Sequence, residues 1–561
     1  MIHAFCTLLL AGSLEVQQAA IPLPAAPRPA QTRDPVTEKK GTAVLKGHVK
    51  TADGRVLRRA QISVRGTGLP NARTASTGLE GEFEIRELPA GRYTITASRS
   101  GFLSSQYGQR RSGDQGKPLE VADGATIESI DFALDRAGVI SGRVTDETGE
   151  PVANASVYNL QAQFFRGRRQ FVPVATGLPG HATTDETGLY RLTPVPPGDY
   201  VIVATFRETW VSDDKEKQTL GYAPSYFPGT ASVADAQRIK IVAGQEAAAI
   251  DFSLVPGRTA AISGTVTAVD GAPLGGADVV LRQEMMGPMG GSVGFPGRAR
   301  TAADGAFKLR NIAPGEYIVE ATGTAGDRGN ESASMPLTVL GPDIDGLILR
   351  ADAGGLVAGR VVTDSGDALP ASTARVVTQS ATFVRSSTAV PPVEDGLAGP
   401  DGRFIRRGPT GPAFVRIGGL PAGWALKRVQ IGEREVTDVP IDIRAGLTLP
   451  DVTVVITKRL GGIGGTVTDA QGRPADGPVV LFPADAAKWH EAVGSLRSAR
   501  PDQAGKYRFD TVRPGDYLII AVEQMESWQV NDPEVLAALR DRATKVTIAD
   551  EPATLDLKVV R

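Results

Sequence analysis

The chain is poor in the residues that build disulfide frameworks and metal centres. Its 561 residues include one cysteine, Cys6, and four histidines: His3, His48, His181 and His490. A single cysteine excludes an intramolecular disulfide. A catalytic zinc site needs about three protein ligands, usually with at least two histidines, and these four are far apart in the sequence. We therefore expect no metal and no other cofactor.

Long apolar runs and an excess of charge are also missing. No apolar run reaches the ~18 residues that a membrane-spanning helix needs, so we expect no transmembrane span. The formal net charge is −2, whereas proteins that bind nucleic acid usually carry a basic excess. Nucleic acid is therefore not an expected partner. Glycine and proline are abundant, with 65 and 39 residues, which is typical of a folded chain with many turns.

The N-terminus has the pattern of a targeting segment. Residues 4–12 are apolar, and Ala19 and Ala20 are small residues of the kind found at cleavage sites. Residues 1–20 are therefore predicted to be a signal peptide, and the proline-rich residues 21–43 a linker. This predicts export to the periplasm, the outer-membrane surface or the medium. The alternative is a disordered tail, because the segment has no Lys or Arg before its apolar run.

A repeat centred on Gly-x-Val is the strongest signal in the sequence. Its five glycines are spaced by 95, 122, 95 and 106 residues, and they are Gly47, Gly142, Gly264, Gly359 and Gly465. A Gly-containing turn and a second β-type run follow each one, which is typical of a β-hairpin. Units one to three also close with a similar Ile-Asp motif, at Ile130, Ile250 and Ile344.

A second repeated element ends in tyrosine. A Pro-Gly or Pro-Ala-Gly turn precedes Tyr93, Tyr200, Tyr317 and Tyr517, and each tyrosine begins an alternating Tyr-x-Ile/Val-x-Ala strand. A period of two predicts strands with one buried face. In the fourth repeat Gly411-Pro412-Ala413-Phe414 replaces this element, and we expect Arg416 in its β-branched position. That repeat is either a variant unit or a segment that pairs with the fifth.

Short strands separated by turns predict an all-β chain of five β-sandwiches. The predicted ranges are 44–137 (unit one), 138–257 (unit two), 258–354 (unit three), 355–458 (unit four) and 459–561 (unit five). One short C-terminal helix is expected, with Asp532 as its cap, Pro533 in its first turn and its end near Arg542.

A third motif, Asp-x-x-Gly-x-Tyr/Phe, runs from Asp185 to Tyr190 in unit two. Together, the Gly-x-Val, Asp-x-x-Gly-x-Tyr/Phe and Pro-Gly-x-Tyr motifs resemble the carboxypeptidase regulatory-like domain. The resemblance implies a transthyretin-like (Ig-like) sandwich, also grouped with carbohydrate-binding-like folds, and a non-catalytic accessory role. It supplies no catalytic residues to transfer. The only nucleophile-elbow match, Gly290-Gly291-Ser292-Val293-Gly294, has no helix pattern behind it and is interpreted as a loop.

Unit two carries the candidate binding surface. Its stretch 164–227 holds ten of the 31 aromatic residues of the chain. Aromatic rings beside arginines can stack on sugars or anchor a protein partner. The candidate binding residues are Phe164, Phe165, Arg168, Trp210, Tyr222, Tyr226 and Phe227. The alternative is that these aromatics form a satellite core or a contact between units.

These observations favour a non-enzymatic, exported array with a role in adhesion or binding at the cell envelope or outside it, and with a polysaccharide or other glycan as the preferred ligand. The second hypothesis is a structural or protein-interaction array that couples envelope components without a glycan ligand. A hydrolase is the third, and the histidine count argues against it. The sequence leaves the oligomeric state open.

Overall fold

A computed structural model describes the chain from Gly41 onwards. The described residues are 41–66, 69–165, 168–174, 181–213, 215–283, 297–324, 330–370, 374–381, 395–490 and 494–560. The predicted signal peptide, nearly all of the linker and the Gly290–Gly294 motif lie outside them. No helix among the described residues is long and apolar enough to cross a membrane.

Nearly all regular structure in the described part is β, as predicted, and it falls into five groups of strands around separate cores. The strands of units one and two are β1 (Ala43–Thr51), β2 (Gln61–Gly66), β3 (Arg73–Ser76), β4 (Glu82–Leu88), β5 (Gly91–Ser98), β6 (Ser105–Gln106), β7 (Leu119–Val121), β8 (Thr126–Ile127), β9 (Phe132–Leu134), β10 (Gly138–Thr145), β11 (Ser156–Phe165), β12 (Arg168–Pro173), β13 (Ala182–Thr183), β14 (Leu189–Val195), β15 (Gly198–Thr205), β16 (Thr209–Val211), β17 (Thr219–Ala223), β18 (Ser225–Tyr226), β19 (Ile239–Ile241), β20 (Glu246–Ala247), β21 (Phe252–Ser253) and β22 (Val255–Arg258).

The later units follow the same order of elements. Their strands are β23 (Ala260–Thr267), β24 (Asp278–Gln283), β25 (Gly297–Arg300), β26 (Ala306–Ile312), β27 (Gly315–Thr324), β28 (Asn330–Val339), β29 (Ile344–Arg350), β30 (Gly355–Thr363), β31 (Arg375–Ser380), β32 (Arg403–Gly408), β33 (Gly411–Gly418), β34 (Ala425–Ile431), β35 (Arg434–Glu435), β36 (Ile441–Ile443), β37 (Thr448–Thr457), β38 (Gly461–Thr468), β39 (Val479–Pro483), β40 (Arg497–Ala499), β41 (Lys506–Val512), β42 (Gly515–Val522), β43 (Thr544–Ile548), β44 (Pro552–Thr554) and β45 (Leu557–Val560).

Two sheets face each other in unit one, and units two to four also divide their strands between separate sheets. In unit five, β45 pairs with both β38 and β42 and joins the strands into one sheet. One sheet of unit one has the order β4-β1-β8 with β9 also on β1, and the other has the order β3-β2-β5-β6 with β7 also on β5. The side chains between them form one core, in which Leu45, Ile62 and Ile95 are fully buried. The predicted alternation of the tyrosine strand is confirmed, because Tyr93, Ile95 and Ala97 all have exposures of 1% or less.

The Gly-x-Val glycines allow the first and last strands of each unit to approach. A Cβ atom at Gly47 would lie 2.1 Å from the Ile130 carbonyl oxygen, and the equivalent distances at the other four glycines are 1.7–2.1 Å. Only glycine fits so close to a backbone carbonyl. The Ile-Asp motif completes this contact, since the His48 N–H donates to Asp131 Oδ1 at 2.9 Å.

The C-terminal helix is confirmed as α1 (Pro533–Arg540). Asp532 is its N-cap and accepts from the Glu534 N–H at 3.0 Å, with Pro533 in the first turn. Leu536 and Leu539 are buried. They pack with residues of β39 and β42 in a second cluster of unit five. Short 3-10 turns occur at Val233–Asp235, Ala486–Lys488 and Gln529–Asn531.

Unit four has its own core and also packs against unit five. The expectation that Arg416 takes the β-branched position is wrong, because Val415 lies in the core while Arg416 points to the opposite face of β33. On that face Phe414 contacts the His490 ring of unit five, with ring centroids 5.0 Å apart. Arg513 of unit five pairs with Asp438 at 2.6 Å. The divergent residues of unit four therefore serve this interface.

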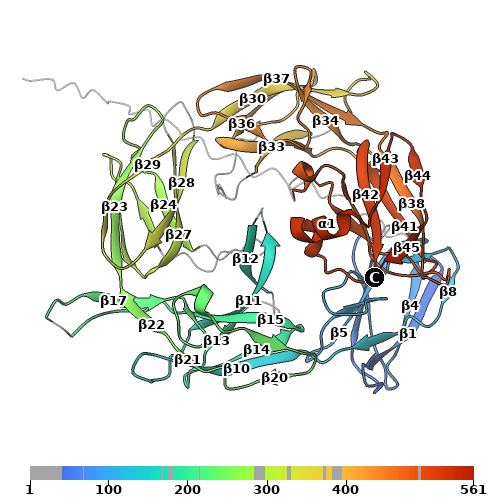
Figure 1. The fold of residues 1–561 in the computed structure, drawn as a ribbon, viewed down its shortest axis with the longest axis horizontal. Helices are drawn as coiled ribbons and strands as arrows, with labels where there is room; N and C mark the ends of the chain where they lie inside the picture. Colours follow the sequence, from blue (N-terminus) through green and yellow to red (C-terminus); the bar gives the residue numbers. More distant parts are fainter. Residues whose placement is uncertain are drawn as a thin grey trace, which may run out of the picture.

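The five units close into a ring in which units one and five lie side by side (Figure 1). Arg500, whose side chain is only 3% exposed, donates from Nη1 to the Gln115 carbonyl of unit one at 2.7 Å. Asp476 of unit five pairs with Arg110 at 2.5 Å, and Lys117 lies 3.7 Å from it. These contacts join segments more than 350 residues apart in the sequence.

A hairpin of unit two adds a further contact to unit five. Strands β11 and β12 extend towards α1 in the interior of the ring (Figure 1). Arg169 on β12 pairs through Nη2 with Asp532 at 2.8 Å and with Glu534 at 2.9 Å. The cap of α1 therefore also holds the hairpin.

Candidate functional site

A groove of about 510 Å³ lies where unit two meets unit three. Its unit-two wall comes from β11, the end of β15, the segment after β15 and β17. Its unit-three wall comes from the end of β24 and the turn between β26 and β27. The lining residues that carry the argument below are Asn154, Tyr158, Arg207, Glu208, Asn311 and Tyr317. Grooves of this size are typical of small-ligand sites.

The junction between these units is built from paired strands, so the groove walls are held in place. Strand β22, which leads into unit three, pairs with β17 of unit two. The boundary predicted between residues 257 and 258 cuts through this strand. A Cβ atom at Gly257 would lie 2.7 Å from Pro314 of unit three, so the two units touch closely there.

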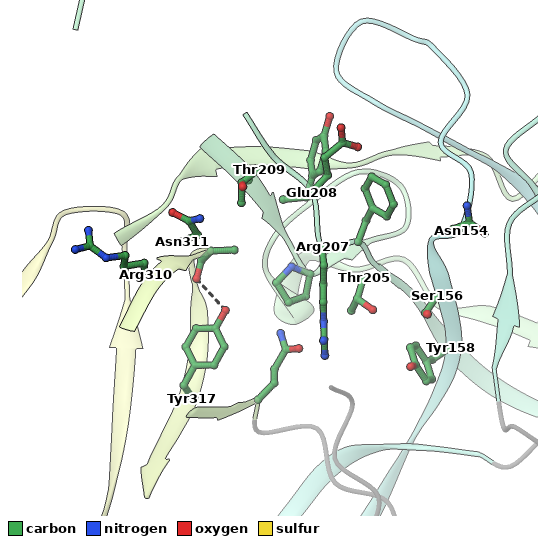
Figure 2. Close-up of a pocket in the computed structure, with 16 residues that line it drawn as sticks. Asn154, Ser156, Tyr158, Thr205, Arg207, Glu208, Thr209, Arg310, Asn311 and Tyr317 are labelled. Atoms are coloured by element: carbon green, nitrogen blue, oxygen red, sulfur yellow. Dashed lines mark hydrogen bonds between the residues drawn. The ribbon is translucent and has the colours of Figure 1, made fainter. Parts of the chain in front are cut away.

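Arg207 extends into the middle of the groove (Figure 2). In that view Tyr317 of unit three lies on one side of it and Tyr158 of unit two on the other, while Arg310 points away at the outer edge. The Tyr317 hydroxyl donates to the Ala313 carbonyl at 2.8 Å, so it is already engaged within the turn. Tyr158 lies 5.0 Å from the His181 ring, and burial raises the pKa of its hydroxyl. Both phenols therefore remain neutral at physiological pH.

Tyr222 lines the groove on the unit-two side. It is 9% exposed, and its hydroxyl donates to Glu147 Oε2 at 2.8 Å. Burial and this hydrogen bond raise the pKa of Tyr222. Trp210 packs on it with ring centroids 4.7 Å apart, and Phe206 packs at 6.1 Å.

The other aromatic residues proposed from the sequence lie in cores. Tyr226 is 9% exposed and belongs to a cluster with Leu160, Val201 and Val203. Phe227 packs edge-on against Phe252 at 6.2 Å. This placement agrees with the alternative interpretation, in which these rings form a satellite core.

The remaining candidates lie on the β11–β12 hairpin. Phe164 is partly buried near its tip. The backbones of Phe165 and Arg168 pair with each other there, and their side chains lie outside the described part. The start of β11 lines the groove, but the tip of the hairpin extends towards unit five, and Phe164 is not among the groove-lining residues.

Sequence reasoning missed the unit-three wall of the groove, including Asn311. Asn311 has φ = 57°, a left-handed conformation that asparagine tolerates better than most residues, at the end of β26. Thr511 occupies the same place in unit five with φ = 55°. The repeat therefore explains the backbone of Asn311, and only the placement of unit three against unit two makes it part of a site.

The comparison with protein families decides what these units are. The model of the carboxypeptidase regulatory-like domain matches residues 44–135, 139–254 and 261–335, which is just over half of the chain. The chain belongs to this family. The matches fall on the first three units of this carboxypeptidase regulatory-like protein.

Several known structures resemble the carboxypeptidase regulatory-like chain distantly. The Bacillus anthracis TIE protein is 14% identical over 71% of this chain and 69% of its own, with a TM-score of 0.15. A streptococcal ancillary pilin is 12% identical over 55% and 98%, with a TM-score of 0.20. A Pseudomonas aeruginosa protein with a suggested carbohydrate-binding role is 16% identical over 16% and 88%, with a TM-score of 0.13. No curated protein matches the chain. Scores this low support no functional argument.

Among the described residues, no three His, Cys, Asp or Glu side chains gather in a way that could hold a metal ion. Within the same part of the chain, His490 lies against Phe414 at the contact between units four and five, and His48 lies 3.4 Å from Asp131 in unit one.

Proposed function

We propose that this chain is a non-catalytic, exported binding protein whose ligand is a carbohydrate held in the groove between units two and three. The lining of the groove is the observation that carries the proposal. Tyr158 and Phe206 offer partly buried rings, while Asn154, Ser156 and Asn311 offer amide and hydroxyl groups. Rings that pack on sugar faces, beside groups that hydrogen bond to hydroxyls, are a combination suited to saccharides.

The non-catalytic part of the proposal rests on the carboxylates of the groove. Most glycoside hydrolases use two carboxyl groups on either side of the scissile bond. Among the lining residues of the described groove only Glu208 carries one, and neither His nor Cys is present. Export rests on the sequence pattern of residues 1–20 alone.

Retention on immobilised polysaccharides tests the proposal. Purified protein would be passed over a panel of neutral polysaccharides and cell-wall fractions, beside Arg207→Ala. Arg207 is exposed, so its removal should leave the melting profile unchanged while weakening retention at least tenfold, the effect of losing about 1.4 kcal/mol. Arg434→Ala, an exposed arginine of unit four, is the matched control. If no polysaccharide or cell-wall fraction of the panel retains the wild-type protein, the proposal fails.

A structural array is the second candidate, favoured by the contacts between units one and five. Arg500 and Asp476 fix the relative position of the first and last units. A protein of this kind would retain no polysaccharide and would instead bind an envelope protein through an outer face. The wild-type protein, Arg207→Ala and Arg434→Ala would then all pass through the polysaccharide panel without retention.

A further inference from the structure

A second groove, of about 770 Å³, lies between units one and two and is lined by arginines. The positive side chains come from both units. Arg59 and Arg99 belong to unit one, Arg136 to the end of unit one where it joins unit two, and Arg191 to unit two. Glu246 is the one carboxylate among the described lining residues. The local excess of positive charge contrasts with a chain whose formal net charge is −2.

The segment that joins the two units, at Arg136 and Ala137, is hydrogen-bonded to both of them. The Ala137 N–H donates to the Gly101 carbonyl of unit one at 3.2 Å. The Gly244 N–H of unit two donates to the Arg136 carbonyl at 2.9 Å. The groove is therefore held open by backbone contacts on both sides, and little ordering is needed when a ligand binds.

Three of the four arginines have no acidic partner in the described part of the chain. Arg191 pairs with Glu246 at 2.5 Å, which neutralises that side. The guanidinium groups of Arg99 and Arg136 lie over the Phe102 ring instead, at 5.7 and 5.4 Å from its centroid. Cation–π contact orients a guanidinium group without cancelling its charge. These two groups are thus positioned, charged and available to an anion.

Hydroxyl and amide groups surround the arginines. Ser98, Ser100, Ser104, Thr193 and Gln61 also line the groove. Such groups match the hydroxyls of a sugar, while a guanidinium group binds a carboxylate or sulfate with two parallel hydrogen bonds. Single-stranded nucleic acid would require open aromatic faces for its bases. Phe102 is the one aromatic residue of the lining, and arginines occupy its ring.

We propose that the groove between units one and two is a separate site for acidic polysaccharide, in which Arg99 and Arg136 pair with the carboxylate or sulfate groups of consecutive sugars. Arg59 lies at the same groove and extends the positive surface. This site does not depend on the groove between units two and three. The carboxypeptidase regulatory-like chain would then hold a charged glycan at one junction of its units and a neutral one at the next.

Binding of polygalacturonate and of dextran sulfate to the full chain tests this proposal, with uncharged dextran as the blank. The key variant is Arg99→Gln/Arg136→Gln, which retains part of each side-chain stem and removes both charges. We expect its affinity for the acidic probe to fall at least tenfold. The matched control is Arg350→Gln/Arg434→Gln, which removes the same charge from exposed positions in other units and should bind like the wild type. Binding of only one of the two acidic probes identifies the preferred anion.

A second variant guards against loss of folding in the first. Ser100→Glu adds a carboxylate at an exposed position of the groove and leaves both arginines on Phe102, and it should weaken binding equally. The proposal is overturned if neither acidic probe binds the wild type, or if the control double variant loses as much affinity as the key one. Stronger binding of a single-stranded oligonucleotide would also overturn it. If Arg207→Ala abolishes binding of the acidic probe and Arg99→Gln/Arg136→Gln does not, the ligand belongs to the groove between units two and three.

Discussion

At each Gly-x-Val glycine, the absence of a Cβ atom allows the first and last strands of the unit to pack closely. At Gly142 the Ile250 carbonyl oxygen occupies the space of a side chain, and a Cβ atom there would lie only 2.1 Å away. The Tyr190 hydroxyl donates to the same carbonyl at 2.8 Å, so the strand cannot move away without breaking a buried hydrogen bond.

We therefore expect Gly142→Ala to destabilise unit two by about 1–3 kcal/mol, the usual range for an overpacked core. Scanning calorimetry of the full chain would show that unfolding begins at a lower temperature than in the wild type. Gly418→Ala is the control, because a Cβ atom at Gly418 meets nothing within 4 Å. Equal effects of the two substitutions would contradict the proposed role of the glycine.

At the scale of the element, an aspartate organises each Asp-x-x-Gly turn between strands. Asp185 Oδ1 accepts from the Thr187 and Leu189 N–H groups at 2.8 and 3.0 Å. The hydrogen bonds from Thr187 and from the backbone hold the pKa of Asp185 below its ordinary value. Backbone N–H groups, first that of Arg473, do the same to the pKa of Asp469 in unit five.

A carboxylate whose pKa is lowered by folding stabilises the folded state above its unfolded pKa of about 3.9. This contribution is lost as the pH falls through the lower pKa of the folded state. We expect Asp185→Asn to lower the melting temperature at neutral pH and the difference from wild type to shrink below about pH 4. Circular dichroism melts across this range would measure it. A difference for Asp185→Asn that stays constant across this pH range would refute the argument.

The local sequence pattern predicted the strands and the C-terminal helix well, because each unit repeats the same turns and strands. The cap and first turn of α1 followed from Asp532 and Pro533 alone. The core face of β33 in unit four did not, because Phe414 resembles the missing tyrosine and misled the register by one residue. The aromatic lining of the first groove at Tyr222 was visible in the sequence as a local excess of aromatic residues. Its unit-three wall at Asn311 depends on how units meet, for which the sequence has no periodic signal.

The whole molecule is shaped by charges that connect its first and last units. Asp476 is 16% exposed and faces Arg110 and Lys117 of unit one as well as the buried Arg500 of its own unit. Removing the Asp476 carboxylate would leave the buried Arg500 and the mostly buried Lys117 without this partner. None of these residues is distinguished in the sequence, because their partners lie hundreds of positions away.

Asp476→Asn should therefore weaken the contact between units one and five by roughly 3 kcal/mol, near the lower limit for a broken buried pair. We expect the radius of gyration from small-angle X-ray scattering to increase as the ring opens in part of the population. Asp442→Asn removes an exposed surface pair with Arg444 and should change neither stability nor size measurably. A scattering curve for Asp476→Asn that superimposes on that of the wild type would show that other contacts suffice.

The contact that closes the ring between units one and five also limits head-to-tail association of further copies of the chain. Successive units that join head to tail either continue into an open filament or return to their starting point. Here the surface of unit five that could receive another copy is already occupied by unit one, through Arg500 and Gln115. Head-to-tail association through this surface would therefore require the contact between units one and five to open.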